Sequence, residues 1–283
     1  MKFFVIDIGS NSVRLMESDG KNTISKTVKT TRLAKGMCDG ILTADAIERT
    51  AQAVSFFYEQ AKELGGDEIF VFATAAVRKA KNSKDFTDRV KQLCGAFVDV
   101  ISGETEAKLG YIGALGDCDG GVIDVGGAST EITVQQGGKC VYSKSVYVGA
   151  VSVTDNCGQD IFLSKTYIDK MLEEFKSLPN VNYFAIGGTA TTIAAMLLKL
   201  EVYDPKIVNG YEILVNDLKN LVEKLFSLSV EQRKLLKGLH ADRAEVIANG
   251  ALILLGVMQR ASVDKVIVSE SDNLEGYLKI KRK

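Results

Sequence analysis

The sequence predicts an α/β fold made of two similar halves that face each other. The first observation is an internal repeat, since Val-Ile-Asp-Ile-Gly-Ser-Asn-Ser at residues 5–12 recurs as Val-Ile-Asp-Val-Gly-Gly-Ala-Ser at residues 122–129. Each copy is an apolar strand that ends in Asp-x-Gly, turns through small residues and resumes as an alternating strand. The second observation is that apolar strands alternate with amphipathic helices along both halves, which is typical of α/β architecture.

The individual elements follow from apolar periodicity and capping residues. Helices are predicted at about 44–64 behind Thr43, in a short stretch behind Ser83, at 103–114 behind Ser102, and at 164–177, 189–199, 217–226 and 242–260. Strands are predicted at 68–74, 96–101, 183–186 and 265–269, and hairpin turns at 18–21 and 136–139. No low-complexity linker separates the halves, so we expect a short hinge near 116–121.

Composition narrows the class of protein. A length of 283 residues suggests two domains at about 100–200 residues each. The content of 25% charged and 46% hydrophobic residues excludes a mainly disordered chain, a collagen and a disulfide-stapled miniprotein. The net charge of -1 gives no basic excess, so nucleic acid is not an expected partner.

Cysteine usage and hydropathy indicate the compartment. Five cysteines without a C-x-x-C pair predict reduced thiols in a cytoplasmic protein. The N-terminus has no signal-peptide pattern, and the longest apolar stretch, at 251–258, is too short to span a bilayer. We therefore expect no membrane partner.

Three loops of small residues are candidate phosphate sites. They follow strands, so their backbone N–H groups are free to point into one shared space and bind an anion. The third also opens a helix, whose N-terminus favours negative charge. Any one loop could be an ordinary tight turn, but the duplication with a fixed Asp favours phosphate. The predicted phosphate-binding residues are Gly9, Ser10, Asn11, Ser12, Gly126, Gly127, Ala128, Ser129, Gly187, Gly188 and Thr189.

The repeated acids, Asp7 and Asp124, stand directly before two of these loops. A carboxylate would repel bound phosphate unless a cation lies between them, and Mg²⁺ commonly bridges one or two carboxylates to phosphate oxygens. The alternative is that each Asp caps its turn. For Asp7 the two interpretations are equally supported, whereas for Asp124, with Glu131 nearby, the metal is favoured.

Segments 7–15 and 124–131 together resemble the exopolyphosphatase/guanosine pentaphosphate phosphatase (Ppx/GppA) family, which belongs to the actin, sugar-kinase and heat-shock-chaperone superfamily. Further matches lie at 31–33, 73–82, 102–109, 187–189, 243–247 and 268–269. The resemblance implies two ribonuclease-H-like (actin-like ATPase) domains around a central cleft. We expect domain I to comprise 1–118 with about 270–283, and domain II to comprise 119–269.

The resemblance also implies hydrolysis of a terminal phosphoanhydride, in inorganic polyphosphate or guanosine pentaphosphate, and a possible homodimer. It implies that Glu106 is the general base and that Arg78 lies at the cleft, where we expect it to stabilise the charge of the transition state. Asp124 and Glu131 match acids tied to metal and water positioning, and Asp7 is the remaining candidate ligand of Mg²⁺. Without the resemblance, Glu106 could be a solvated helix acid and Arg78 an exposed helix start. Arg14 could face solvent. The lone His240 is expected to be structural, and residues 279–283 are expected to form a solvated tail.

Several positions depart from the family pattern. Thr105 replaces the first acid of the family's Glu-Glu doublet, and Ala128 replaces the third Gly of its Asp-x-Gly-Gly-Gly-Ser loop. Residues 272–276, Asp-Asn-Leu-Glu-Gly, lack the Arg of the family's Gly-Leu-Arg-Glu-Gly. The chain also stops where longer members add a helical region, which makes short polyphosphate the first expected substrate and guanosine pentaphosphate the second. A kinase of the same superfamily and a non-catalytic sensor of an alarmone nucleotide are the competing hypotheses.

Overall fold

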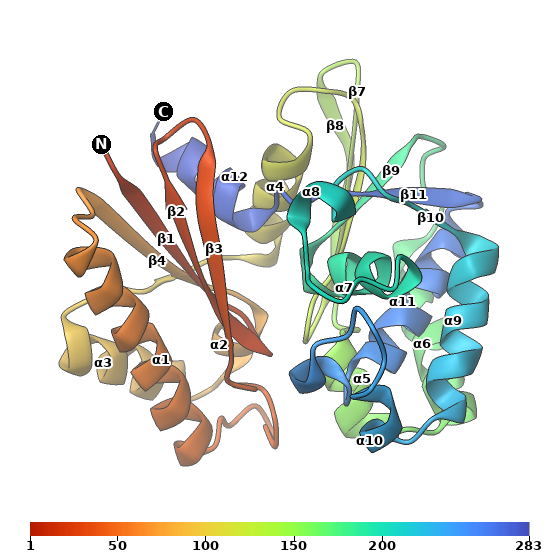
Figure 1. Cartoon of the computed structure of the whole chain (residues 1–283), viewed down its shortest axis with the longest axis horizontal. Helices are drawn as coiled ribbons and strands as arrows, with labels where there is room; N and C mark the ends of the chain where they lie inside the picture. The colour runs from red at the N-terminus through yellow and green to blue at the C-terminus, as the bar shows by residue number, and fades with distance from the viewer. Residues whose placement is uncertain (283) are drawn as a thin grey trace.

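The computed structural model describes residues 1–282 and contains two mixed β-sheets that lie side by side (Figure 1). The first sheet has the order β3-β2-β1-β4-β5. Its central strand β1 pairs antiparallel with β2 and parallel with β4. The strands of this sheet are β1 (Phe3–Ile8), β2 (Ser12–Ser18), β3 (Thr23–Thr30), β4 (Glu68–Ala73) and β5 (Asp99–Val100).

The second sheet repeats this arrangement and adds one edge strand. Its order is β10-β11-β9-β6-β7-β8, so β8-β7-β6-β9-β11 corresponds to β3-β2-β1-β4-β5. The strands are β6 (Gly120–Val125), β7 (Thr130–Gln136), β8 (Lys139–Val146), β9 (Tyr183–Ile186), β10 (Glu212–Leu214) and β11 (Lys265–Val268). The predicted repeat and both predicted hairpins are therefore confirmed.

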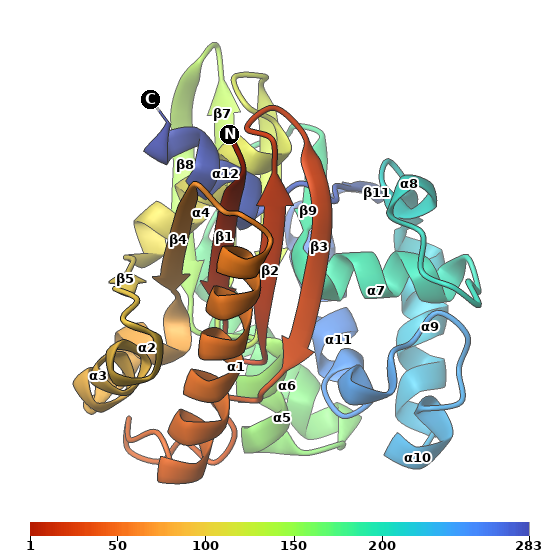
Figure 2. The ribbon, with the colours of Figure 1, turned by 60° about the vertical axis from the view of Figure 1, so that its left-hand side comes forward.

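Helices cover the faces of the two sheets. In Figure 2, α1 lies against the first sheet. Beside the first sheet are α1 (Ala44–Glu63), α2 (Ala75–Lys79) and α3 (Ser83–Cys94). The remaining part of the chain forms α5 (Ala150–Cys157), α6 (Ile161–Leu172), α7 (Gly187–Leu197), α8 (Pro205–Val208), α9 (Val215–Ser227), α10 (Val230–Arg233) and α11 (Ile247–Arg260). No helix within residues 1–282 is long and apolar enough to cross a membrane.

Three predicted elements have a bound that differs from the structure by more than two residues. The helix predicted at 164–177 begins at Ile161, because the Asp160 side chain accepts the backbone N–H groups of the first turn, and it ends at Leu172. The strand predicted at 96–101 is reduced to β5, the two residues that pair with β4. The helix predicted from residue 242 starts at Ile247, after a separate 3-10 turn at Ala241–Arg243.

Two helices join the sheets, α4 (Gly103–Ala114) and α12 (Asn273–Lys281). Helix α4 contacts strands of the second sheet, while α12 packs on both α4 and β1. An apolar cluster that includes Phe3, Phe72 and Leu274 anchors α12 to the first sheet. Helix α12 was not predicted: residues 279–281 belong to it rather than to a free tail, and Lys283 lies outside the described residues. The exact domain bounds stay a prediction.

Candidate functional site: a cleft between the two sheets

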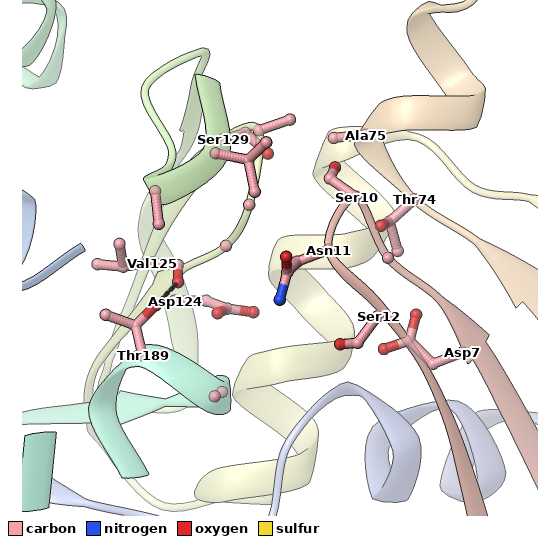
Figure 3. A pocket seen from close by; sticks show the side chains of 18 of the residues that line it. Asp7, Ser10, Asn11, Ser12, Thr74, Ala75, Asp124, Val125, Ser129 and Thr189 are labelled. Carbon is pink, nitrogen blue, oxygen red and sulfur yellow. Dashed lines mark hydrogen bonds between the residues drawn. The ribbon is translucent and has the colours of Figure 1, made fainter. Parts of the chain in front are cut away.

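The repeated loops meet in a cleft of about 90 Å³, which is drawn in Figure 3. All the predicted phosphate-binding residues line it, together with Glu106, Asp7 and Asp124. The loops come from opposite halves of the chain, Gly9–Ser12 after β1 and Gly126–Ser129 after β6. The structure therefore brings together the three loops that the sequence singled out.

The two repeated loops have the same local construction and approach each other closely. The backbone N–H of Gly9 donates to the carbonyl oxygen of Ser12 at 3.0 Å, and Gly126 makes the equivalent bond to Ser129 at 2.9 Å. A Cβ added to Gly127 would lie 2.9 Å from the Cβ of Ser10, so only a glycine fits there without a shift. Each loop is a tight turn, and the backbones of the two loops line the same cleft.

The third loop is fixed to the second by Thr189 and Gly187. The Thr189 hydroxyl donates to the carbonyl oxygen of Val125 at 2.7 Å, a bond that is drawn in Figure 3. Gly187 has φ of +76°, and a Cβ there would lie 2.6 Å from Oδ1 of Asp124. Glycine is needed at this position both for its backbone conformation and for the close approach of that carboxylate.

Glu106 lies in the first turn of α4 and is 7% exposed. Its Oε2 accepts a 2.7 Å bond from Nη1 of Arg78, which also donates to the carbonyl oxygen of Ile101 at 3.1 Å. Burial raises the pKa of Glu106 although the Arg78 guanidinium opposes the shift. Arg78 itself does not line the cleft. The structure places Arg78 behind Glu106, where it orients that carboxylate.

The two repeated acids have different neighbours. Asp7 pairs with Arg14, whose Nε lies 3.0 Å from Oδ2, and Arg14 also pairs with Asp272. Asp124 instead accepts a 3.2 Å bond from the amide of Asn273. Burial, and then the charge of Glu106, raise the pKa of Asp124 to about 8.

Glu131 lies next to this group but does not line the cleft. Its Oε1 accepts a 2.5 Å bond from the Ser145 hydroxyl. Burial raises its pKa well above the ordinary value, and the charges of Glu106 and Asp124 add to the shift. Glu106, Asp124 and Glu131 therefore share one buried region, and each accepts a hydrogen bond from a different residue. No group of three or more His, Cys, Asp or Glu within residues 1–282 is arranged to hold a metal by itself.

Four polar cleft residues were not assigned by sequence reasoning, namely Arg14, Thr74, Arg243 and Asn273. Burial, with the nearby charge of Arg14, lowers the pKa of Arg243 to about 10. A Cβ on Gly188 would lie 2.2 Å from the Arg243 guanidinium, so that glycine makes room for it. Arg243 stands in a segment that matched the family pattern, and Arg14 lies opposite Asp7 in the predicted hairpin. Both could have been found from those signals, whereas Asn273 belongs to a helix that was not predicted.

A second pocket of about 460 Å³ adjoins the cleft and shares Arg14, Gly187, Gly188 and Arg243 with it. Its remaining lining is mixed, with apolar and polar side chains. The apolar members include Val28, Leu200, Leu239 and Leu274, and the polar members include Lys26, Tyr203, His240 and Glu270.

Fold and cleft together define the class of protein, in which two ribonuclease-H-like halves bring duplicated glycine- and serine-rich loops to one cleft. The chain belongs to the Ppx/GppA phosphatase family, which matches residues 13–279. This result confirms the predicted family and fold class, and the predicted enzyme class of a hydrolase acting on phosphoric anhydrides.

Individual relatives match nearly the whole chain. A Mycobacterium tuberculosis protein named Exopolyphosphatase 2 is 28% identical, over 96% of this chain and 95% of its own length. A Pseudoalteromonas translucida protein named guanosine-5'-triphosphate,3'-diphosphate pyrophosphatase is also 28% identical, over 98% of this chain but 58% of its own length. The solved structure of an Aquifex aeolicus PPX-GPPA enzyme has a TM-score of 0.79, with 31% identity and 98% coverage of both chains.

Proposed function

We propose that the chain is an exopolyphosphatase that releases terminal orthophosphate from inorganic polyphosphate. The observation that carries the proposal is the meeting of the two repeated loops in one cleft with Glu106 on its wall. The match to Exopolyphosphatase 2 along nearly the full length of both chains favours polyphosphate over the nucleotide.

The residues divide the work of a phosphoryl transfer to water. The N–H groups of Gly9 and Gly126 close their turns, and the remaining backbone N–H groups of the loops, with the hydroxyls of Ser10, Ser12 and Ser129, bind the terminal phosphates. Glu106 orients a water and accepts its proton as the water oxygen bonds to phosphorus and the anhydride P–O bond breaks. Arg78 keeps Glu106 in place through the 2.7 Å bond. Arg243 lines the cleft, and its guanidinium has no carboxylate partner among residues 1–282. It is therefore available to bind the phosphate.

Mg²⁺ is the proposed cofactor, and Asp124 fits it best of the three acids considered. Its carboxylate points into the cleft (Figure 3), and it has no arginine or lysine partner within residues 1–282. The raised pKa of Asp124 is what a buried acid without a compensating cation has. When bound, Mg²⁺ would neutralise charge on the phosphate oxygens. Asp7 is already paired with Arg14. Glu131 lies opposite Asp124 on the neighbouring strand and does not line the cleft.

Guanosine pentaphosphate is the second candidate substrate, and the second pocket is the observation that favours it. That pocket joins the cleft and combines apolar and polar walls, as a nucleoside would require. Polyphosphate needs no such space. A homodimer and a cytoplasmic location stay predictions.

The experiment compares phosphate release from tripolyphosphate, longer polyphosphate and guanosine pentaphosphate with Mg²⁺ present. Glu106→Gln should lower kcat by about 10²–10⁴-fold, because it removes the general base. Glu104→Gln is the matched control, since Glu104 lies in the same helical turn but is exposed. Equal rates in wild type and Glu106→Gln would overturn the mechanism. Phosphate transfer from ATP to an acceptor would favour a kinase, and tight nucleotide binding without release would favour a sensor.

A further inference from the structure

The N-terminus of α12 reaches both repeated acids, although it belongs to neither repeat. Asp272 and Asn273 are consecutive residues, and each is 4% exposed. Asp272 pairs with Arg14, the partner of Asp7. Asn273 donates its amide to Oδ2 of Asp124 at 3.2 Å. One turn of helix thus contacts the Asp of the second repeat directly and the Asp of the first repeat through one arginine.

Close helix packing fixes this turn. A Cβ on Gly113 of α4 would lie 1.9 Å from the carbonyl oxygen of Asp272, and a Cβ on Gly276 of α12 would lie 1.9 Å from that of Leu109. A Cβ on Gly110 would lie 2.9 Å from Oδ1 of Asn273. Glycines therefore let α12 rest directly on α4, the helix that carries Glu106. One closely packed pair of helices thus holds all three acids that line the cleft.

The contact of Asp272 with Arg14 and the contact of Asn273 with Asp124 differ in charge. Asp272 gives Arg14 a second carboxylate, so this guanidinium is compensated on both sides and stays with Asp7. Asn273 is neutral, so it orients Asp124 without supplying a positive charge that would compete with a cation. A lysine or arginine at position 273 would instead neutralise Asp124.

We propose that Asp272 and Asn273 are positioning residues, which hold the two repeated aspartates in place for phosphoanhydride hydrolysis. The inference rests on the proposed function for its reaction, but it does not depend on which phosphate substrate is used. The simpler alternative is that Asp272 serves only as the helix cap, since its Oδ1 accepts the backbone N–H of Leu274 at 3.0 Å.

Three variants separate positioning from capping. Asn273→Leu removes the bond to Asp124 at similar volume. Asp272→Asn keeps a capping side chain but removes the charge opposite Arg14. Glu275→Gln is the matched control, because Glu275 accepts the backbone N–H of Asp272 and pairs with Lys26, but does not touch Asp7, Asp124 or Arg14, and a glutamine can still accept that N–H.

The measurements are kcat and KM for tripolyphosphate and guanosine pentaphosphate, the melting temperature, and calorimetric titration of Mg²⁺ in the presence of inorganic phosphate. Loss of a residue that orients a metal ligand typically costs about 10–100-fold in metal affinity or activity. We expect a loss of this size in kcat and in Mg²⁺ affinity for Asn273→Leu, with KM nearly unchanged, and a smaller loss in kcat for Asp272→Asn. Glu275→Gln should change the melting temperature alone.

Two results would overturn the inference. One is a wild-type affinity for Mg²⁺ in Asn273→Leu, which tests the inference even if no hydrolysis is found. The other is a fall in kcat that is the same in Glu275→Gln as in the two positioning variants, because that would show a general effect of the helix start. Absence of phosphate release by the wild type would instead count against the proposed function.

Discussion

The two hairpins that carry the repeated aspartates share one register but differ in the residue opposite each acid. In the first hairpin Asp7 lies opposite Arg14, and in the second Asp124 lies opposite Glu131. These positions are equivalent, since each partner is seven residues beyond its Asp in the sequence. The repeat therefore kept its backbone and exchanged a stabilising cross-strand pair for a repulsive one.

This difference indicates a division of labour between the halves. The Asp7 carboxylate has a cation partner within the protein, which opposes the effect of burial on its pKa and suits a structural anchor. Burial raises the pKa of both Asp124 and Glu131, and the charge of Asp124 adds to the shift of Glu131, an arrangement that costs stability in the absence of a cation. Such a cost is typical of sites where acids serve binding or proton transfer.

Replacing Arg14, the cationic side chain of the first hairpin, should have the largest effect on stability. Arg14 is 17% exposed in its side chain, and its partners Asp7 and Asp272 are each 6% exposed. Arg14→Leu leaves two buried carboxylates unpaired, and breaking a buried pair in this way costs about 3–5 kcal/mol. Urea unfolding at pH 7 measures the change.

The matched control for this comparison is Arg32→Ala. Its pair with Glu245 is about one-third exposed on both sides, so its loss should cost at most about 1 kcal/mol. An equal loss of stability in the two variants would contradict a special role for the buried Asp7–Arg14–Asp272 arrangement.

The second test exchanges each repeated acid for its amide. Asp124→Asn should lower kcat by about 10²-fold or more, because charge stabilisation by a bound cation is worth several kcal/mol. Asp7→Asn should change kcat by less than about tenfold, because its charge is already compensated by Arg14. Steady-state phosphate release at saturating substrate measures both. Equal losses would mean that the halves are functionally alike.

The sequence could predict the parts of the fold that arise from local pattern. The repeat, both hairpins and the α4 helix cap at Ser102 follow from short segments, and the structure has them at the predicted places. The three loops also converge as predicted, because each follows the end of a central strand of its sheet.

The charge partners of the cleft could not be predicted in the same way. Arg14 meets Asp272 across 258 positions of sequence, and Asn273 meets Asp124 across 149. Helix α12 begins at a capping Asp but has only nine residues, and its apolar face reads as helical only once α4 and β1 are known to lie beneath it. Long-range contacts of this kind are set by the fold and leave no local signal.

The contact between the repeated loops offers a third test. Gly127→Ala places a methyl group 2.9 Å from the Cβ of Ser10, which is closer than two carbon atoms can pack without a shift. We expect a loss of about 1–3 kcal/mol in stability, the usual cost of overpacking, together with a higher KM. Ala128→Gly is the neighbouring control, since residue 128 already carries a methyl, and it should cost no more than about 1 kcal/mol. Similar values for both would argue against close packing of the loops.

The smallest expected effect is the pH dependence of stability that comes from Asp124 in the second hairpin. The folded pKa of Asp124 is about 8 against an ordinary value of 3.8, so between these values the folded protein binds a proton that the unfolded chain has lost. Stability contributed by this group therefore falls as pH rises from about 4 to 8. Burial also raises the pKa of Asp7, Glu106 and Glu131, which adds a change of the same sign.

Asp124→Asn should remove the part of this dependence that comes from Asp124, because an amide resembles the protonated acid and does not ionise. In metal-free buffer the variant should gain stability relative to wild type between pH 5 and pH 8. We expect a gain of at least about 1 kcal/mol, because a pKa difference of one between the folded and unfolded states corresponds to about 1.4 kcal/mol. Thermal unfolding at the two pH values measures the gain, and Asp7→Asn is its counterpart in the first hairpin. A gap between Asp124→Asn and wild type that stays constant with pH would contradict a raised pKa of Asp124 in the folded protein.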